Sequence, residues 1–235
     1  MTGFELILAA HLAASHPGPA QFVSAGANAP VACPAQKSAQ VDVHWRSEPI
    51  KYDISQSEAE LAAHHIDTKN PYGVHVATDV GGLMSGKISF QSSTEISSVR
   101  FPAQSLTCLW INRVSVDIVM DPTIQIASEH PKGTCEYVAI LEHESKHVAI
   151  DRGVIEAYLD TIRAAAAQAV QKVGMVGPKP SETGEDFKTK MSKYVEGQIK
   201  AAMDQMYAAR VARQQALDSK AEYDRIAAQC PKGGQ

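Results

Sequence analysis

The sequence predicts an α+β protein in which a mainly antiparallel sheet is followed by two long helices. Residues 41–128 contain short β-prone runs, and from Thr134 onward the apolar residues recur at helical spacing. The clearest strand is "RVSVDIVMD", residues 113–121. Every second residue in its centre is apolar: Val114, Val116, Ile118 and Met120. This alternation predicts a strand with one face in the core.

Two helices have recognisable start signals. Ser57 and Glu60 have the spacing of a capping box, which predicts a short helix inside the β-rich region. Thr134 follows a proline–glycine turn and is expected to cap the N-terminus of a long helix. No strong breaker other than Gly153 interrupts the helical pattern before Gly174.

The remaining chain predicts a linker and a second long helix. Residues 177–184 are rich in glycine and proline, and the helix is expected from Glu185 to Gln229. Its apolar stripe consists of Met191, Val195, Ile199, Met203 and Met206. We therefore expect one domain over residues 33–176 and a C-terminal helical segment, residues 185–235, packed on or near it.

Composition excludes two classes of partner. The net charge is −4 over 235 residues, so no basic surface for nucleic acid is expected. No apolar run approaches the roughly 20 residues that cross a bilayer. We therefore expect neither a nucleic-acid partner nor a transmembrane span.

Residues 1–32 resemble a secretory signal. The apolar run "FELILAAHLAA" is followed by small residues, with A-x-A patterns ending at Ala27 and Ala29. The alternative is an alanine-rich leader without a targeting role. Export would make the chain a secreted or periplasmic protein.

The four cysteines favour disulfides. Their spacing contains no C-x-x-C, which excludes zinc-ribbon and thioredoxin-like motifs. An even number of cysteines in an exported chain is typical of paired thiols. We expect Cys108–Cys135, which would tie a strand to the start of the long helix, and hence Cys33–Cys230. The alternative is four buried thiols.

The long helix contains the pattern H-E-x-x-H, as His143, Glu144 and His147. Composition alone would produce this pattern with a probability of about 0.02. Residues four apart lie on one helix face, so both imidazoles can bind one zinc ion. Glu144 would lie beside them as the general base that takes a proton from a zinc-activated water.

The surroundings of the motif argue against a chance match. One apolar stripe contains Leu141, Val148, Ile155 and Ile162. Other apolar residues, among them Ile140 and Val154, lie beside the histidines. A helix that is apolar on two faces is buried on two faces, whereas a surface helix would be polar around the motif. Upstream, the strand at residues 113–121 is a candidate edge that could hold an extended peptide by strand addition.

This layout resembles the zincin class of metallopeptidases. More closely, "CEYVAILEHESKHVAID" after a β-rich region with cysteines is similar to an uncharacterised family of bacterial predicted secreted zinc-dependent proteases. The resemblance covers roughly Cys33 to Val173. It implies a zincin-like fold, secretion, zinc ligands at His143 and His147, and a general base at Glu144. Lys146 lies where zincins usually have an uncharged residue.

The third zinc ligand is left open by the sequence. A catalytic zinc site normally has three protein ligands and a water. Asp151 continues the line of the two histidines, but on an unbroken helix it lies about 12 Å along the axis from His143. It is therefore expected to support His147, or to bind zinc if the helix ends near Gly153. The alternatives are carboxylates further along the chain: Glu182, Glu185 and Glu196.

We expect a zinc-dependent metallopeptidase that hydrolyses peptide bonds in a peptide or protein substrate. The alternative is an exported, non-catalytic binding or scaffold protein on a zincin-like fold. Lys146 and the missing third ligand motivate that alternative. A structural helical protein with an accidental motif is the third possibility.

Overall fold

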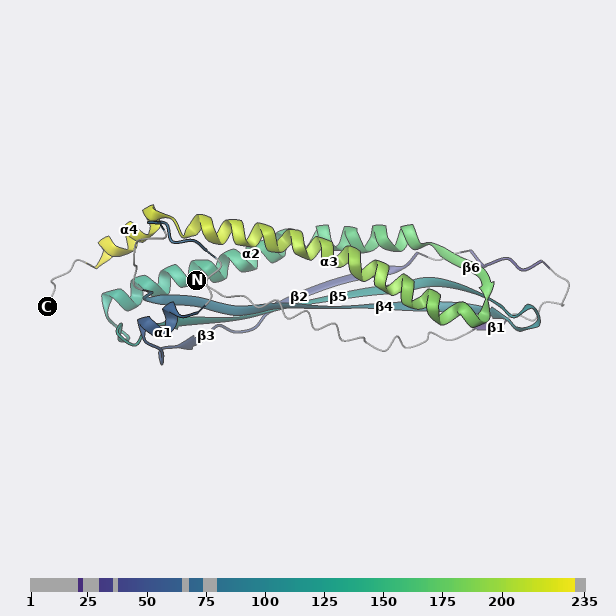
Figure 1. Cartoon of the computed structure of the whole chain (residues 1–235), viewed down its shortest axis with the longest axis horizontal. Helices are drawn as coiled ribbons and strands as arrows, with labels where there is room; N and C mark the ends of the chain where they lie inside the picture. Colours follow the sequence, from purple (N-terminus) through teal and green to yellow (C-terminus); the bar gives the residue numbers. More distant parts are fainter. Residues whose placement is uncertain (1–20, 23–29, 36–37, 65–67, 74–79, 231–235) are drawn as a thin grey trace.

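The computed structural model describes residues 21–22, 30–35, 38–64, 68–73 and 80–230. They form an elongated α+β molecule in which two long helices lie along one long, narrow sheet (Figure 1). The predicted class is therefore confirmed. Most of the predicted leader, residues 1–32, lies outside the described residues. No helix among the described residues is long and apolar enough to cross a membrane.

The sheet is built around one long antiparallel hairpin. β4 (Gly82–Phe101) and β5 (Leu106–Ile126) pair along their whole length. A 3-10 turn, η1 (Pro102–Gln104), and Ser105 in the left-handed region join them. With 21 residues, β5 extends about 70 Å at a rise of roughly 3.3 Å per residue. This hairpin sets the length of the molecule.

Short strands complete the sheet. β6 (Met175–Pro180) is antiparallel to β5, whereas β2 (Gln40–Ser47) and β3 (Lys51–Asp53) are parallel to it. β1 (Gln21–Phe22) is parallel to β4. The prediction of a mainly antiparallel sheet is therefore wrong, because the sheet is mixed. Alternation within a strand shows which face is buried, but it carries no information on the direction of the neighbouring strand.

β5 lies inside the sheet. It pairs with β4 on one side and with β6, β2 and β3 on the other. Residues 113–121 are therefore not an edge strand, which corrects that expectation. The face that alternation predicts to be buried is confirmed at Val114, Val116, Ile118 and Met120. Among the described strands, β4 has a largely open edge opposite β5, because only the two residues of β1 pair with it there, and β2, β3 and β6 each pair only with β5.

The two long helices cover one face of this sheet, whereas the short helix at its end packs Leu61 against Leu83, which belongs to a separate small cluster. α1 (Glu58–Ala62) has the expected capping box between Ser57 and Glu60. α2 (Cys135–Val173) begins at Thr134, whose hydroxyl accepts a hydrogen bond from the backbone N–H of Tyr137. Its 39 residues extend about 58 Å along the sheet and pass Gly153 without a break.

α3 (Gly184–Leu217) runs back along α2 (Figure 1). All five residues of its predicted apolar stripe are buried. α2 is therefore enclosed by the sheet on one side and by α3 on the other. The segment expected as a linker, residues 177–184, forms the end of β6, the 3-10 turn η2 (Ser181–Thr183) and the start of α3.

The second long helix ends earlier than predicted. α3 stops at Leu217, and a separate helix, α4 (Lys220–Gln229), begins after Ser219. The hydroxyl of Ser219 accepts a hydrogen bond from the backbone N–H of Glu222. Serine three residues before glutamate is a helix-start signal in the sequence, and it outweighs the continuous apolar pattern here.

Two disulfides close the fold, and both predicted pairings are wrong. Cys33 pairs with Cys108, and Cys135 pairs with Cys230. Cys108 lies near the hairpin turn, on the order of 60 Å along β5 from the end that leads to α2, so it cannot reach Cys135. Paired cysteines of this kind are typical of secreted and periplasmic proteins.

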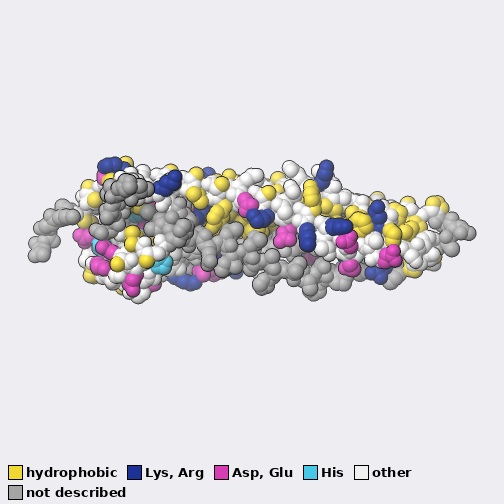
Figure 2. Space-filling view, viewed as in Figure 1, with side chains coloured by type: hydrophobic (Ala, Val, Ile, Leu, Met, Phe, Trp, Pro, Cys, Tyr) yellow, Lys and Arg dark blue, Asp and Glu magenta, His cyan; other side chains and the backbone are white. Residues whose placement is uncertain are grey.

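Positive and negative side chains are interspersed on the face of the molecule shown in Figure 2. This agrees with the small net charge of the chain. No uniformly basic face of the kind that binds nucleic acid is seen from this side.

Candidate metal centre

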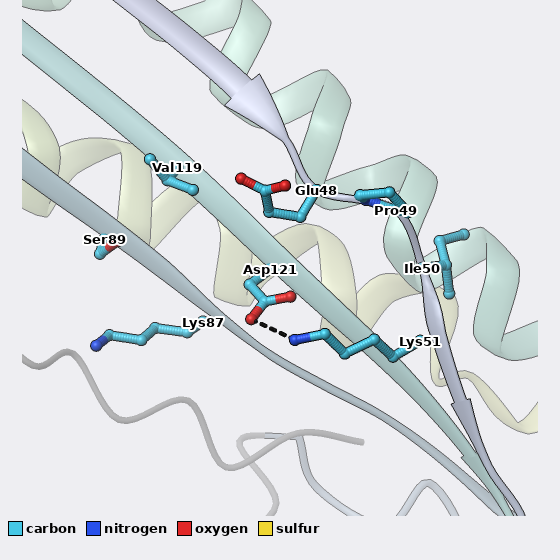
Figure 3. Close-up of a pocket in the computed structure, with 8 residues that line it drawn as sticks. All are labelled: Glu48, Pro49, Ile50, Lys51, Lys87, Ser89, Val119 and Asp121. Atoms are coloured by element: carbon cyan, nitrogen blue, oxygen red, sulfur yellow. Dashed lines mark hydrogen bonds and ion pairs between the residues drawn. The ribbon is translucent and has the colours of Figure 1, made fainter.

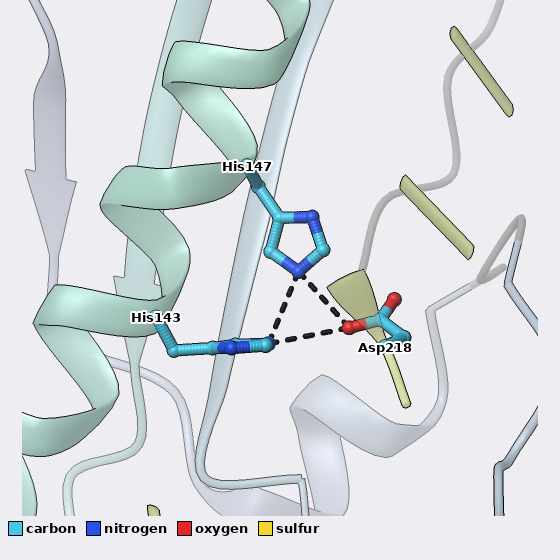
Figure 4. Close-up of side chains that lie close together, drawn as sticks. All are labelled: His143, His147 and Asp218. Atoms are coloured by element: carbon cyan, nitrogen blue, oxygen red, sulfur yellow. Dashed lines mark hydrogen bonds and ion pairs between the residues drawn. The ribbon is translucent and has the colours of Figure 1, made fainter. Parts of the chain in front are cut away.

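Three buried side chains converge where α2 meets the α3–α4 junction (Figure 4). The Nε2 atoms of His143 and His147 lie 3.1 Å apart. Asp218 Oδ1 lies 3.2 Å from the first of these nitrogens and 3.1 Å from the second. Among the described residues, this is the one group of three that could hold a metal ion.

The geometry of this triangle fits zinc. Tetrahedral ligands at roughly 2.0–2.1 Å from a zinc ion lie about 3.3 Å from one another. The three sides of the triangle, 3.1, 3.2 and 3.1 Å, are close to this value. Two imidazole nitrogens and one carboxylate oxygen are also a ligand set that zinc favours. Asp218 Oδ2 is also buried.

The break between α3 and α4 positions Asp218. Its ψ of 55° leaves the helical region, so the chain turns after Asp218 and α3 ends there. Burial opposes ionisation of this carboxylate, but hydrogen bonds with His143 and His147 outweigh burial and hold its pKa below the ordinary value. Sequence reasoning missed Asp218 because it treated residues 185–229 as one helix.

His147 is oriented from behind by Gln214. The Gln214 amide nitrogen donates to the backbone oxygen of His147 at 3.1 Å and to Asp151 Oδ1 at 2.5 Å. With the amide nitrogen facing two acceptors, its oxygen faces His147 Nδ1 and accepts the proton of that nitrogen. The Nε2 lone pair is then directed at the metal position.

Asp151 does not join the two imidazoles, so Asp218 replaces it as the third candidate ligand. Asp151 accepts hydrogen bonds from Gln214 and from Arg210 Nε, the latter at 2.7 Å. Burial raises the pKa of Asp151, and the charge of Arg210 opposes this. Asp151 thus contacts Gln214, which in turn bonds to His147, whereas the sequence led us to expect Asp151 to support His147 directly.

The other predicted carboxylates lie too far along the chain to contribute. Glu182 is in η2 and Glu185 is in the first turn of α3, about 50 Å from Asp218 at 1.5 Å per residue. Glu196 is about 33 Å away by the same measure.

Glu144 lies beside the triangle and outside it. Its side chain is buried, and Oε2 accepts a hydrogen bond of 2.6 Å from the backbone N–H of Met84 on β4. Gly82 makes this approach of β4 to α2 possible. A Cβ there would overlap Ile140 and come within 3.2 Å of the Glu144 carboxylate. Because Met84 donates its N–H to Glu144 and not to β5, this N–H lies on the open edge of β4.

A cavity of about 470 Å³ opens onto His143 and Glu144. α2, α4, the start of β4 and α1 contribute to its walls. Its apolar lining includes Pro71, Val80, Ile140, Ile226 and Ala227. His130 also lines the cavity but pairs with Glu58 at 2.9 Å, so it is a candidate substrate contact and not a ligand. The cavity can admit part of a substrate to the metal position.

A second cavity, of about 570 Å³, lies on the sheet (Figure 3). It is lined by charges of both signs, and Lys51 pairs with Asp121 across it at 2.8 Å. It contains no histidine and none of the residues of the metal centre. The cavity beside His143 and Glu144 is therefore the better candidate for a functional site.

Comparison of the chain with protein-family models, with curated proteins and with solved structures finds no significant match. The geometry and chemistry of the site are therefore the basis for a function.

Proposed function

We propose that this protein is a zinc-dependent hydrolase that cleaves peptide bonds, with His143, His147 and Asp218 as zinc ligands and Glu144 as general base. The observation that carries the proposal is the buried triangle with a second buried carboxylate beside it, with His143 and Glu144 lining one cavity. The resemblance to zincins supports the same assignment for His143, Glu144 and His147.

Each residue has a distinct chemical task. A zinc ion held by the triangle would lower the pKa of water and polarise the substrate carbonyl. Glu144 accepts a proton from the attacking water and donates it to the leaving amine. The N–H of Met84 donates a hydrogen bond to the Glu144 carboxylate and holds it in place.

The open edge of β4 is the proposed place for the substrate backbone. An extended peptide can add to a strand edge through main-chain hydrogen bonds, and this edge lies beside Glu144. The apolar cavity would receive a side chain next to the cleaved bond. The two disulfides support a secreted or periplasmic location.

Metal analysis and a hydrolysis assay test this function. The purified full chain should contain about one equivalent of zinc and cleave members of a fluorogenic peptide library. Glu144→Ala should keep the zinc and abolish cleavage, because Glu144 does not belong to the ligand triangle. Glu156→Ala, an exposed glutamate on the same helix, is the matched control and should behave like the wild type.

Two outcomes would contradict the proposal. A folded wild-type chain that binds no zinc would exclude the metal centre. Zinc binding without cleavage of any peptide would favour the non-catalytic scaffold. Asp218 weakens that alternative, because a missing third ligand was one of its two motivations, beside Lys146.

A further inference from the structure

Lys146 is a charged residue inside the H-E-x-x-H pattern, and it pairs with two glutamates, neither of which belongs to the ligand triangle. Its amine lies 2.9 Å from Glu222 Oε1 on α4 and 3.1 Å from Glu142 Oε1 on α2. Arg225 also donates to Glu222, from Nε and Nη2, at 2.8 Å each. Two cations from two helices therefore fix one carboxylate.

The Glu222 carboxylate lies on the Nδ1 side of the His143 ring, whereas Nε2 faces the metal position. Glu222 Oε1 is 3.5 Å from His143 Nδ1. This nitrogen is buried and makes no hydrogen bond with any described residue. The distance is slightly longer than a hydrogen bond, so a small movement of either side chain would close it. His147 has Gln214 in the corresponding position.

We propose that Lys146 is a positioning residue of the metal centre, which holds Glu222 against His143 Nδ1. Glu222 then accepts the Nδ1 proton of His143 and directs its Nε2 lone pair toward the zinc. This inference rests on the proposed zinc site. It gives a role to the charge that departs from the usual zincin pattern.

Lys146 and Glu222 also join α2 to α4, and Asp218 lies just before α4. A merely structural effect is therefore possible, in which losing Lys146 loosens α4 and displaces Asp218. The two effects differ at the histidines. Loss of positioning exposes the Nδ1 proton of His143 alone, whereas a loosened α4 disturbs both imidazoles, since both contact Asp218.

The experiment uses the full chain with both disulfides formed and zinc alone as the ligand. Competition with a chromophoric chelator gives the zinc dissociation constant, and NMR of ¹⁵N-labelled histidine gives the solvent exchange rate of each Nδ1 proton. The variants are Lys146→Met, Lys146→Arg and Glu222→Gln. Lys172→Met, an exposed lysine on the same helix, is the matched control.

Lys146→Met should weaken zinc binding about 10-fold, at the lower end of the range for residues that support a metal ligand. Its His143 Nδ1 proton should exchange faster, with that of His147 unchanged. Lys146→Arg should restore both measurements, Glu222→Gln should resemble Lys146→Met, and Lys172→Met should resemble the wild type.

Unchanged affinity in Lys146→Met, or equally accelerated exchange at both histidines, would overturn the positioning role. If the wild type binds zinc and cleaves peptides in either case, the proposed function stands without this inference. If the wild type binds no zinc, the proposed function fails, and the inference fails with it.

Discussion

His143 Nε2 and Asp218 Oδ1 lie 3.2 Å apart, although 75 residues separate them in the chain. The intervening residues form the rest of α2, β6 and α3. A metal ion held by this pair and His147 would connect the start of α2 to the far end of α3. The centre therefore depends on the packing of the whole helical layer.

Substitution of the third ligand should reduce zinc affinity more than substitution of a supporting residue. Asp218→Ala removes one of three ligands, so we expect a loss larger than the roughly 10–100-fold typical of supporting residues. Glu196→Gln should leave the affinity unchanged. Chelator competition measures both. If Glu196→Gln abolishes binding and Asp218→Ala does not, the assignment of Asp218 is wrong.

Gln214 should control the orientation of His147. Gln214→Leu removes the acceptor of the Nδ1 proton at similar volume, and we expect zinc affinity to fall by about 10–100-fold. The Nδ1 proton of His147 should then exchange faster with solvent, while that of His143 remains protected. Gln215→Leu is the neighbouring control, because Gln215 bonds to Lys69 and not to the centre. Equal zinc affinities for the two variants would contradict this role.

The two disulfides should differ in their effect on the centre. Replacing either pair by serines should lower the free energy of unfolding by about 2–4 kcal/mol, because each pair closes a long loop. Only Cys135–Cys230 joins α2 to the end of α4, so its loss should also weaken zinc binding. The Cys33–Cys108 double variant is the matched control. Urea unfolding and chelator competition measure the two effects, and weakened zinc binding in both variants would contradict the distinction.

Zinc binding should weaken as the pH falls, beginning above pH 6.5. Burial lowers the pKa of His147, but Asp218 and Glu144 outweigh burial and raise it above its ordinary value of 6.5 in the metal-free protein. Zinc requires the neutral imidazole, so protons compete as the pH falls through the raised pKa.

The stability of the metal-free fold depends on pH in the opposite direction from zinc binding. Protonated His147 paired with Asp218 stabilises it fully below the pKa of histidine in the unfolded chain. This contribution is lost as the pH rises through the raised pKa of the folded state. The increase in Tm on adding zinc should therefore be larger at about pH 8 than at about pH 6. An increase that does not change with pH would contradict this reasoning.

Local signals in the sequence predict the elements of the fold well. Thr134 correctly marks the start of α2, and the alternation of Val114 to Met120 correctly marks the buried face of β5. These features depend on neighbours in the chain, so the sequence contains them. The same holds for Ser57 and Glu60 at α1.

Contacts between distant segments were not predictable in this way. The parallel pairing of β2 with β5 and the partners of Cys108 and Cys135 depend on tertiary packing. Asp218 is an intermediate case. Ser219 and Glu222 have the spacing of a helix start, which would have revealed a break next to an aspartate. The contact between Asp218 and His143 still depends on α3 running back along α2, which the sequence does not predict.

The late position of Asp218 affects when the proposed activity can arise. During synthesis the chain carries His143, Glu144 and His147 long before Asp218 is added. A growing chain, or one cut within α3, thus contains the recognisable motif with an incomplete centre. If the proposed function holds, activity would begin only once α3 has folded against α2 and brought Asp218 to the two histidines.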